Sequence, residues 1–113
     1  IDWRYAKDAR SAIARLWSGI EAIFGINSEL VYRISLLSAS LLASRGSERK
    51  QKFQEVKQLY GLRSKAVYGV KLPDEKMANA VNGSFQLLAD LLLLAIQRGH
   101  AFSQEDFDNA VFE

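Results

Sequence analysis

The residues best suited to chemistry lie around Tyr60, where basic side chains interrupt an apolar helical face. The three-and-four spacing of that face holds Phe53, Val56, Tyr60 and Val67, and Arg63 falls on the same line. A guanidinium there needs a carboxylate, a phosphate or water at the edge of the core. Its planar fork can bind two phosphate oxygens at once. The segment therefore predicts a site for an anion.

Metal-free cleavage of RNA is a reaction that such an arginine can serve. This reaction deprotonates the 2′-hydroxyl, protonates the leaving 5′-oxygen and stabilises charge on the scissile phosphate. Arg63 can stabilise that charge, and Lys65 can add charge at closer range. The sequence offers no convincing base nearby, because its one histidine, His100, follows the fourth predicted helix. His100 is expected to have a capping or surface role.

Motifs for other chemistry are missing from the sequence. It has no glycine-rich phosphate loop, no Cys/His metal set, no serine beside a plausible base and no H-E-x-x-H pair. It also has no cysteine, which excludes disulfides and thiolate chemistry. We therefore expect neither a metal nor a cofactor.

Five helices are predicted to position these residues, with apolar side chains repeating at helical spacing in each. They cover about 2–24, 28–43, 47–68, 73–98 and 103–112. Glycines are expected to end three of them, at Gly25, Gly46 and Gly99. The expected start signals are Asn27 or Ser28 as the N-cap of the second helix, Ser47 as the N-cap of the third, Pro73 in the first turn of the fourth, and Ser103 with Asp106 as a capping box of the last. Phe102 and Phe107 should form a hydrophobic staple at the last helix.

The fourth predicted helix carries two apolar stripes. One consists of Met77, Val81, Phe85, Leu88, Leu92 and Ala95, and the other, beside it, of Leu87, Leu91 and Leu94. We expect this helix to be buried on two sides. In the second helix, small residues (Ser35, Ser38, Ala39, Ser40 and Ala43) should let a neighbouring helix approach closely.

The composition favours one domain spanning residues 1–113. With 113 residues, 49% of them hydrophobic, the chain can bury one modest core. The predicted fold is all-α, an up-and-down bundle of four long helices plus a short C-terminal helix. The longest apolar run, Leu91 to Ile96, is short of the roughly 20 residues of a membrane span. No secretory leader is visible, so we expect a soluble, cytoplasmic protein without a membrane partner.

Charge is distributed unevenly along the chain. The net charge is +2, yet residues 45–71 carry eight basic residues against Glu48 and Glu55. A field of this sign favours a polyanion such as nucleic acid. The alternative is a solvated basic helix face. If nucleic acid is bound, its expected contacts are Lys57, Ser64, Lys65 and Lys71.

Three segments carry a resemblance to a known family. They are 16–24 (LWSGIEAIF), 29–35 (ELVYRIS) and 59–69 (LYGLRSKAVYG), the last being the most specific. Together they resemble the HEPN superfamily, and most closely its Apea-like branch, over about Ile13 to Ile96.

The resemblance implies an all-helical homodimer whose active members cut single-stranded RNA without metal. The family motif is an arginine, four to six intervening residues and a histidine. Arg63 matches the arginine, whereas Tyr68 stands where the histidine is expected. With a pKa of about 10, tyrosine is a poor base near neutral pH. Glu21 matches a carboxylate near the motif arginine, so a Glu21–Arg63 contact is predicted, either as part of a catalytic site or as a structural tie.

Four hypotheses follow for the function. The first is an RNA-binding or ribonuclease-like dimer with catalytic residues Arg63, Tyr68 and Glu21 and an altered active site. The second is a non-catalytic dimerisation or interaction module of a larger defence or stress-response protein. In the third, Tyr68 is modified by a partner nucleotidyltransferase of a toxin–antitoxin pair. The fourth is a plain helical bundle. Arg33 is expected to pair with an acid rather than to take part in catalysis.

Overall fold

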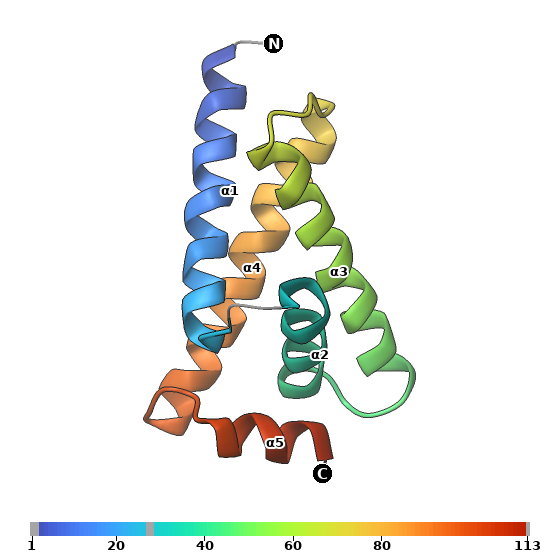
Figure 1. Ribbon diagram of the computed structural model, residues 1–113, viewed down its shortest axis with the longest axis vertical. Coiled ribbons are helices and arrows are strands. Elements are labelled where there is room, and N and C mark those ends of the chain that lie inside the picture. The colour runs from blue at the N-terminus through green and yellow to red at the C-terminus, as the bar shows by residue number, and fades with distance from the viewer. Residues whose placement is uncertain (1–2, 27–28, 113) are drawn as a thin grey trace.

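Five helices, as predicted, make up the part of the chain that the structure describes (Figure 1). The computed structural model describes residues 3–26 and 29–112. Its helices are α1 (Trp3–Phe24), α2 (Leu30–Leu42), α3 (Ser47–Val67), α4 (Asp74–Arg98) and α5 (Gln104–Phe112). The prediction of an all-helical bundle with a short C-terminal helix is therefore confirmed.

The long helices pack along one another, and α5 crosses one end of the bundle. In Figure 1, α1 and α4 run in the same direction and α3 runs in the opposite direction. Both α4 and α3 pack against α1, while α2 packs mainly against α3 and α5. The bundle measures 46 × 28 × 25 Å. Residues far apart in the sequence thus meet in one elongated core.

Helix ends follow the predicted signals with small shifts. Gly25 and Gly99 end α1 and α4 with φ of 63° and 81°, a left-handed conformation that favours glycine. Ser47 is the first helical residue and not the predicted N-cap, because Gly46, at φ 93°, occupies the cap position. Likewise Pro73 is the N-cap of α4, one residue before the predicted first turn. The predicted caps Asn27 and Ser28 lie outside the described residues.

The start of α5 shows the predicted capping box. The backbone N–H of Ser103 donates to Asp106 Oδ2 (2.8 Å), and the N–H of Asp106 donates to Ser103 Oγ (3.2 Å). The hydrogen bond from the Ser103 N–H lowers the pKa of Asp106 below its usual value, and nearby His100 and Arg98 act in the same direction. Phe102 and Phe107 pack with ring centroids 5.8 Å apart, which confirms the staple.

The core is centred on α1 and α4. Ile13, Trp17 and Ile20 of α1 are fully buried, as are Leu91 of α4 and Ala66 of α3. In α2, the small residues Ser35, Ser38, Ala39 and Ser40 are buried, as expected for a helix that its neighbour approaches closely. Val67, which the spacing places on the apolar face of α3, is 44% exposed, whereas its neighbour Ala66 is fully buried.

The two predicted stripes of α4 are only partly buried within the chain. The buried positions are Met77, Ala80, Ser84, Leu87 and Leu91. In the stripe that begins at Met77, Phe85 and Leu92 are exposed, so the expectation of burial on two sides was wrong along that stripe for the single chain. By length and composition α4 is also apolar enough to cross a membrane, a test that core helices of soluble proteins pass too. A globular bundle is compatible with the expected soluble protein.

Candidate functional site

Arg63 lies where α3 meets α1 and faces a carboxylate. Its Nη2 is 3.6 Å from Glu21 Oε1, so the predicted Glu21–Arg63 contact is confirmed. The two side chains are 23% and 26% exposed. The pair therefore sits at the edge of the core, neither free in solvent nor fully buried.

An aromatic cluster packs against the arginine. The Arg63 guanidinium lies over the Tyr60 ring, 5.3 Å from its centroid, in cation–π geometry. Tyr60 in turn meets Trp17 edge to face, with centroids 5.4 Å apart and an interplanar angle of 86°. Trp17 Nε1 donates a buried hydrogen bond to Ser84 Oγ (2.9 Å). The cluster thus connects α1, α3 and α4 next to the charged pair.

The charged pair leaves hydrogen-bonding capacity unused. Arg63 Nε and Glu21 Oε1 are buried atoms without a hydrogen-bond partner in the part of the chain that the structure describes. A separation of 3.6 Å is also longer than the 2.7–2.9 Å of a charge-assisted hydrogen bond. The enclosed Nε is out of reach of an anion from solvent, so any anion would meet the exposed part of the guanidinium, whose side chain is 23% exposed.

Tyr68 does not join Arg63. It is the C-cap residue of α3, its N–H donates to Ser64 O, and it is 82% exposed. Five residues along a helix turn through about 140°, so Tyr68 projects from a different side of α3 than Arg63. Of the three predicted catalytic residues, the chain brings together Arg63 and Glu21 only.

The residues predicted to contact nucleic acid lie on the outer side of α3 and beyond its end. Lys57, Ser64 and Tyr68 are seven and four residues apart, which places them on one face, with Lys65 beside it. The three lysines Lys57, Lys65 and Lys71 are exposed, and Ser64 is half-buried. This basic face is directed away from the Arg63–Glu21 pair.

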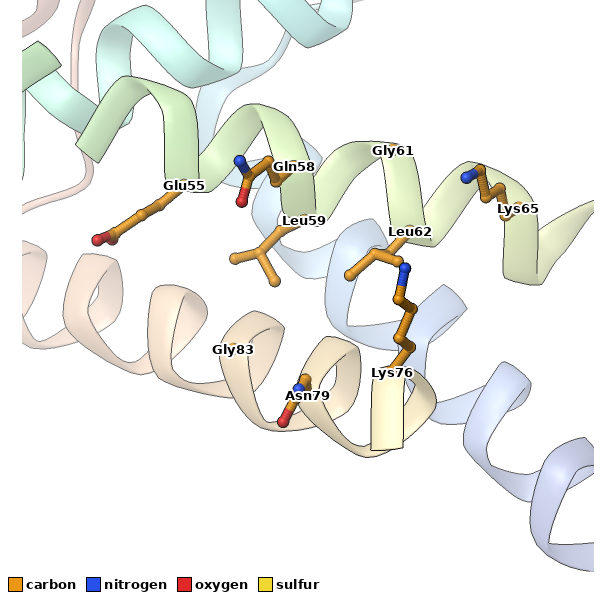
Figure 2. A pocket seen from close by; sticks show the side chains of 9 residues that line it. All are labelled: Glu55, Gln58, Leu59, Gly61, Leu62, Lys65, Lys76, Asn79 and Gly83. Atoms are coloured by element: carbon orange, nitrogen blue, oxygen red, sulfur yellow. The ribbon is translucent and has the colours of Figure 1, made fainter. Parts of the chain in front are cut away.

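A groove of about 610 Å³ separates α3 from α4 (Figure 2). Leu59 and Leu62 give it an apolar floor, and Gly61 and Gly83 form part of its walls. Figure 2 shows Lys65 and Lys76 toward one end and Glu55 toward the other. Apart from Lys65, the groove contains none of the predicted site residues.

Three basic residues of the 45–71 segment make contacts within the chain. Arg63 pairs with Glu21, and Lys52 pairs with Glu55 at 3.7 Å. Arg49 donates to the carbonyl oxygens of Ser40, Ala43 and Ala110, at 3.1–3.4 Å, and so ties α2 and α5 to the start of α3. Arg49 could not be predicted from the sequence, because nothing in its local pattern distinguishes it from a solvated charge.

Two further predicted roles can be located. Arg33 pairs with Glu29 at 3.5 Å, one helical turn away, as expected for a structural partner. His100 is exposed, with Nδ1 2.9 Å from Ala101 O and 3.8 Å from Asp106 Oδ2, far along the chain from Arg63. Among the described residues no cluster of His, Asp or Glu could hold a metal ion.

Comparisons with protein-family models, curated proteins and solved structures gave no match to this chain. The resemblance to HEPN domains therefore stays a prediction.

Proposed function

We propose that this chain is a HEPN-like, RNA-binding homodimer whose ribonuclease site is altered at Tyr68. The observation that carries the proposal is the contact between Arg63 and Glu21 across α1 and α3. The resemblance implied this pairing between residues 42 positions apart, and the two side chains meet at 3.6 Å. The partly exposed guanidinium of Arg63 is the group that would bind a phosphate oxygen.

The surroundings of Arg63 support binding better than cleavage. Acid–base catalysis needs a proton acceptor within hydrogen-bond reach of the 2′-hydroxyl. Glu21 already faces the guanidinium, and Tyr68 points elsewhere from the end of α3. The chain as it stands should therefore bind RNA and cleave it slowly or not at all.

Exposed lysines along α3 support contact with a phosphate backbone. Lys57 and Lys65 lie on its outer side, and Lys71 follows in the connection to α4. Each lysine that neutralises a phosphate releases a counterion, so affinity should fall as salt rises. A polyanion such as single-stranded RNA suits this surface.

The second candidate is a non-catalytic association module of a larger defence or stress-response protein. It is favoured by the exposed apolar residues of α4, including Phe85 and Ile96, which are 61% and 73% exposed. Faces of this kind usually mark interaction sites. Under this candidate the Arg63–Glu21 pair only ties α1 to α3.

An RNA assay separates the two candidates. Labelled single-stranded RNA is incubated in EDTA with the chain, with Tyr68→His, and with Tyr68→His carrying Arg63→Ala. We expect RNA binding by the chain and by Tyr68→His, and weaker binding by the variant that carries Arg63→Ala. Cleavage is expected from Tyr68→His alone, and it needs a second subunit to bring the histidine to Arg63, because the two positions lie on different sides of α3. If none of them cleaves RNA, the ribonuclease-like assignment loses its support.

Binding is tested with Lys57→Ala combined with Lys65→Ala. This variant should lose about tenfold or more in affinity and show a shallower salt dependence. Lys7→Ala, which removes an exposed lysine of α1, is the matched control and should bind like the unchanged chain. Equal affinity for all variants, or no binding at all, would favour the association module.

A further inference from the structure

The groove between α3 and α4 carries two lysines at one of its ends. Lys65 of α3 and Lys76 of α4 both line it, and Figure 2 shows the Lys76 side chain reaching from α4 toward Leu62 of α3. Both lysines are exposed. Neither forms an ion pair with an Asp or Glu in the part of the chain that the structure describes. This end of the groove therefore presents two positive charges that no carboxylate contacts.

The other end of the groove carries no unpaired cation. Glu55 lies there (Figure 2), and its Oε2 is 3.7 Å from Lys52 Nζ. Ten residues separate Glu55 from Lys65 along α3, which corresponds to about 15 Å at 1.5 Å per residue. An anionic group is favoured at the lysine end, whereas a second anionic group would meet a carboxylate at the Glu55 end. The charges thus favour a ligand with a single anionic end.

The groove is apolar between its two ends. Leu59 and Leu62, both half-buried, form its floor. Small-molecule sites commonly combine an apolar lining with a few polar groups that orient the ligand. The volume of about 610 Å³ also lies within the roughly 300–1,000 Å³ of such sites.

Two glycines determine the shape of the groove. Gly61 and Gly83 are the only glycines within α3 and α4, and both line it. A Cβ at Gly83 would lie 2.7 Å from Leu59 Cδ2, so glycine lets Leu59 lie against α4. A Cβ at Gly61 would meet no atom within 4 Å. Glycine destabilises a helix interior relative to alanine, and no contact within the described residues requires it at Gly61, whereas a ligand lying over this position would.

We propose that the groove binds a small amphiphilic monoanion. Its anionic group lies between Lys65 and Lys76, and its apolar body lies along Leu59 and Leu62 and over Gly61. The two ammonium groups donate charge-assisted hydrogen bonds to the anionic oxygens. The apolar body is removed from water against the leucine side chains. This binding site goes beyond the proposed RNA-binding function.

A helix of a partner protein fits the groove less well than a small molecule does. The lining residues extend over about three turns of α3, from Glu55 to Lys65, and about two turns of α4, from Lys76 to Gly83. A stable protein interface buries roughly 800 Å² on each partner, which a contact of two to three helical turns does not reach.

Calorimetric titration of the chain with octanoate tests the proposal, with octanol and acetate as comparison probes. Octanol lacks the charge and acetate lacks the apolar body. We expect octanoate to bind, and the other two to bind about tenfold or more weakly. Octanedioate, which has a carboxylate at both ends, should also bind more weakly than octanoate, because its second carboxylate finds no unpaired cation near Glu55.

Variants at the lysine end test the position of the anionic group. Lys76→Ala removes one of the two cations and should raise the dissociation constant for octanoate about tenfold. The matched control is Lys50→Ala, which removes an exposed lysine of α3 that does not line the groove and should leave the affinity unchanged.

Variants at Gly61 test the position of the apolar body. Gly61→Glu places a carboxylate in the groove one helical turn before Lys65 and should abolish octanoate binding. Gly61→Ala adds only a methyl group and should retain most of the affinity. Both variants should fold, because a Cβ at this position meets no atom within 4 Å.

Four outcomes would overturn the proposal. They are no binding of octanoate, equal affinity for octanoate and octanol, equal effects of Lys76→Ala and Lys50→Ala, and unchanged affinity in Gly61→Glu. RNA binding is read separately, through Lys57 and Lys65, and Lys76 is not among the predicted RNA contacts. The proposed function and this binding site can therefore fail independently.

Discussion

The buried and the outward sides of α4 carry different side chains, and the hydrophobicity of those side chains does not by itself explain which of them are buried. The buried side contains Ala80 and Ser84, both fully enclosed. The outward side contains Phe85 and Ile96, which are far more apolar and mostly exposed. Ser84 and Phe85 are neighbours in the sequence. The helix thus buries Ala80 and Ser84 together with Met77, Leu87 and Leu91, while it exposes two of its large apolar residues.

Close packing explains the choice of the buried side. Small residues let α1 and α3 approach α4, and Ser84 supplies the acceptor that the buried Trp17 N–H requires. Bulky residues at the same positions would hold the helices apart. Large apolar side chains on the outward side are the ones expected at a contact with another molecule.

The largest expected effect comes from the adjacent pair Leu91 and Leu92. Leu91→Ala should destabilise the chain by about 2–5 kcal/mol, because Leu91 is fully buried and the substitution leaves a cavity. Leu92→Ala removes a side chain that is 46% exposed and should cost under about 1 kcal/mol in the monomer. Urea denaturation at low protein concentration measures both.

The same pair also reports on association. As the protein concentration rises, the stability of the unchanged chain should increase if it forms the proposed homodimer, since mass action favours the associated state. Leu92→Ala should weaken that dependence if the exposed apolar side of α4 is the face that associates. If the two alanine variants lose the same stability at low protein concentration, the buried and outward sides of α4 contribute equally to the stability of the monomer.

A middle-sized effect is expected at Ser84. Ser84→Ala removes the acceptor of the Trp17 N–H and leaves a buried donor unpaired, which costs about 1–3 kcal/mol. The control is a double-mutant cycle with Trp17→Phe, which removes the donor. If the hydrogen bond matters, Ser84→Ala should cost clearly less in the Trp17→Phe background. Additive losses in thermal denaturation would show that Ser84 acts by its size alone.

The smallest effect concerns two glycines at the groove between α3 and α4. At Gly61 a Cβ would meet no atom within 4 Å, so Gly61→Ala should stabilise the helix by roughly 0.5–1 kcal/mol. At Gly83 a Cβ would lie 2.7 Å from Leu59 Cδ2, so Leu59 must move. Gly83→Ala should therefore gain nothing. If Gly83→Ala is more stable than Gly61→Ala, the Leu59 side chain can move away from the added methyl group without a cost in stability.

Local signals made much of the fold predictable. The capping box at Ser103, the glycine ends at Gly25 and Gly99 and the staple of Phe102 on Phe107 depend on residues close in sequence. Such signals can be read without knowledge of the tertiary arrangement. The Glu21–Arg63 contact was predictable for another reason, since the resemblance supplied the pairing of distant residues.

The rest depended on which helices meet in space. Both stripes of α4 suit a core, and the sequence alone does not say which of their residues α1 and α3 cover. The spacing likewise places Val67 on the apolar face of α3, yet Val67 is 44% exposed and its neighbour Ala66 is buried. The same holds for Arg49, whose acceptors lie on α2 and α5.

The hydrogen bond between Trp17 and Ser84 closes a separation of 67 residues, and this has a consequence for how the chain folds. Contacts between distant residues form late, because the intervening chain must first lose its conformational freedom. During synthesis, α1 emerges with Ile13, Trp17 and Ile20 unprotected until α4 has followed it. We therefore expect the nascent chain to stay incompletely folded until α4 has been made, and to be most prone to aggregation over that interval.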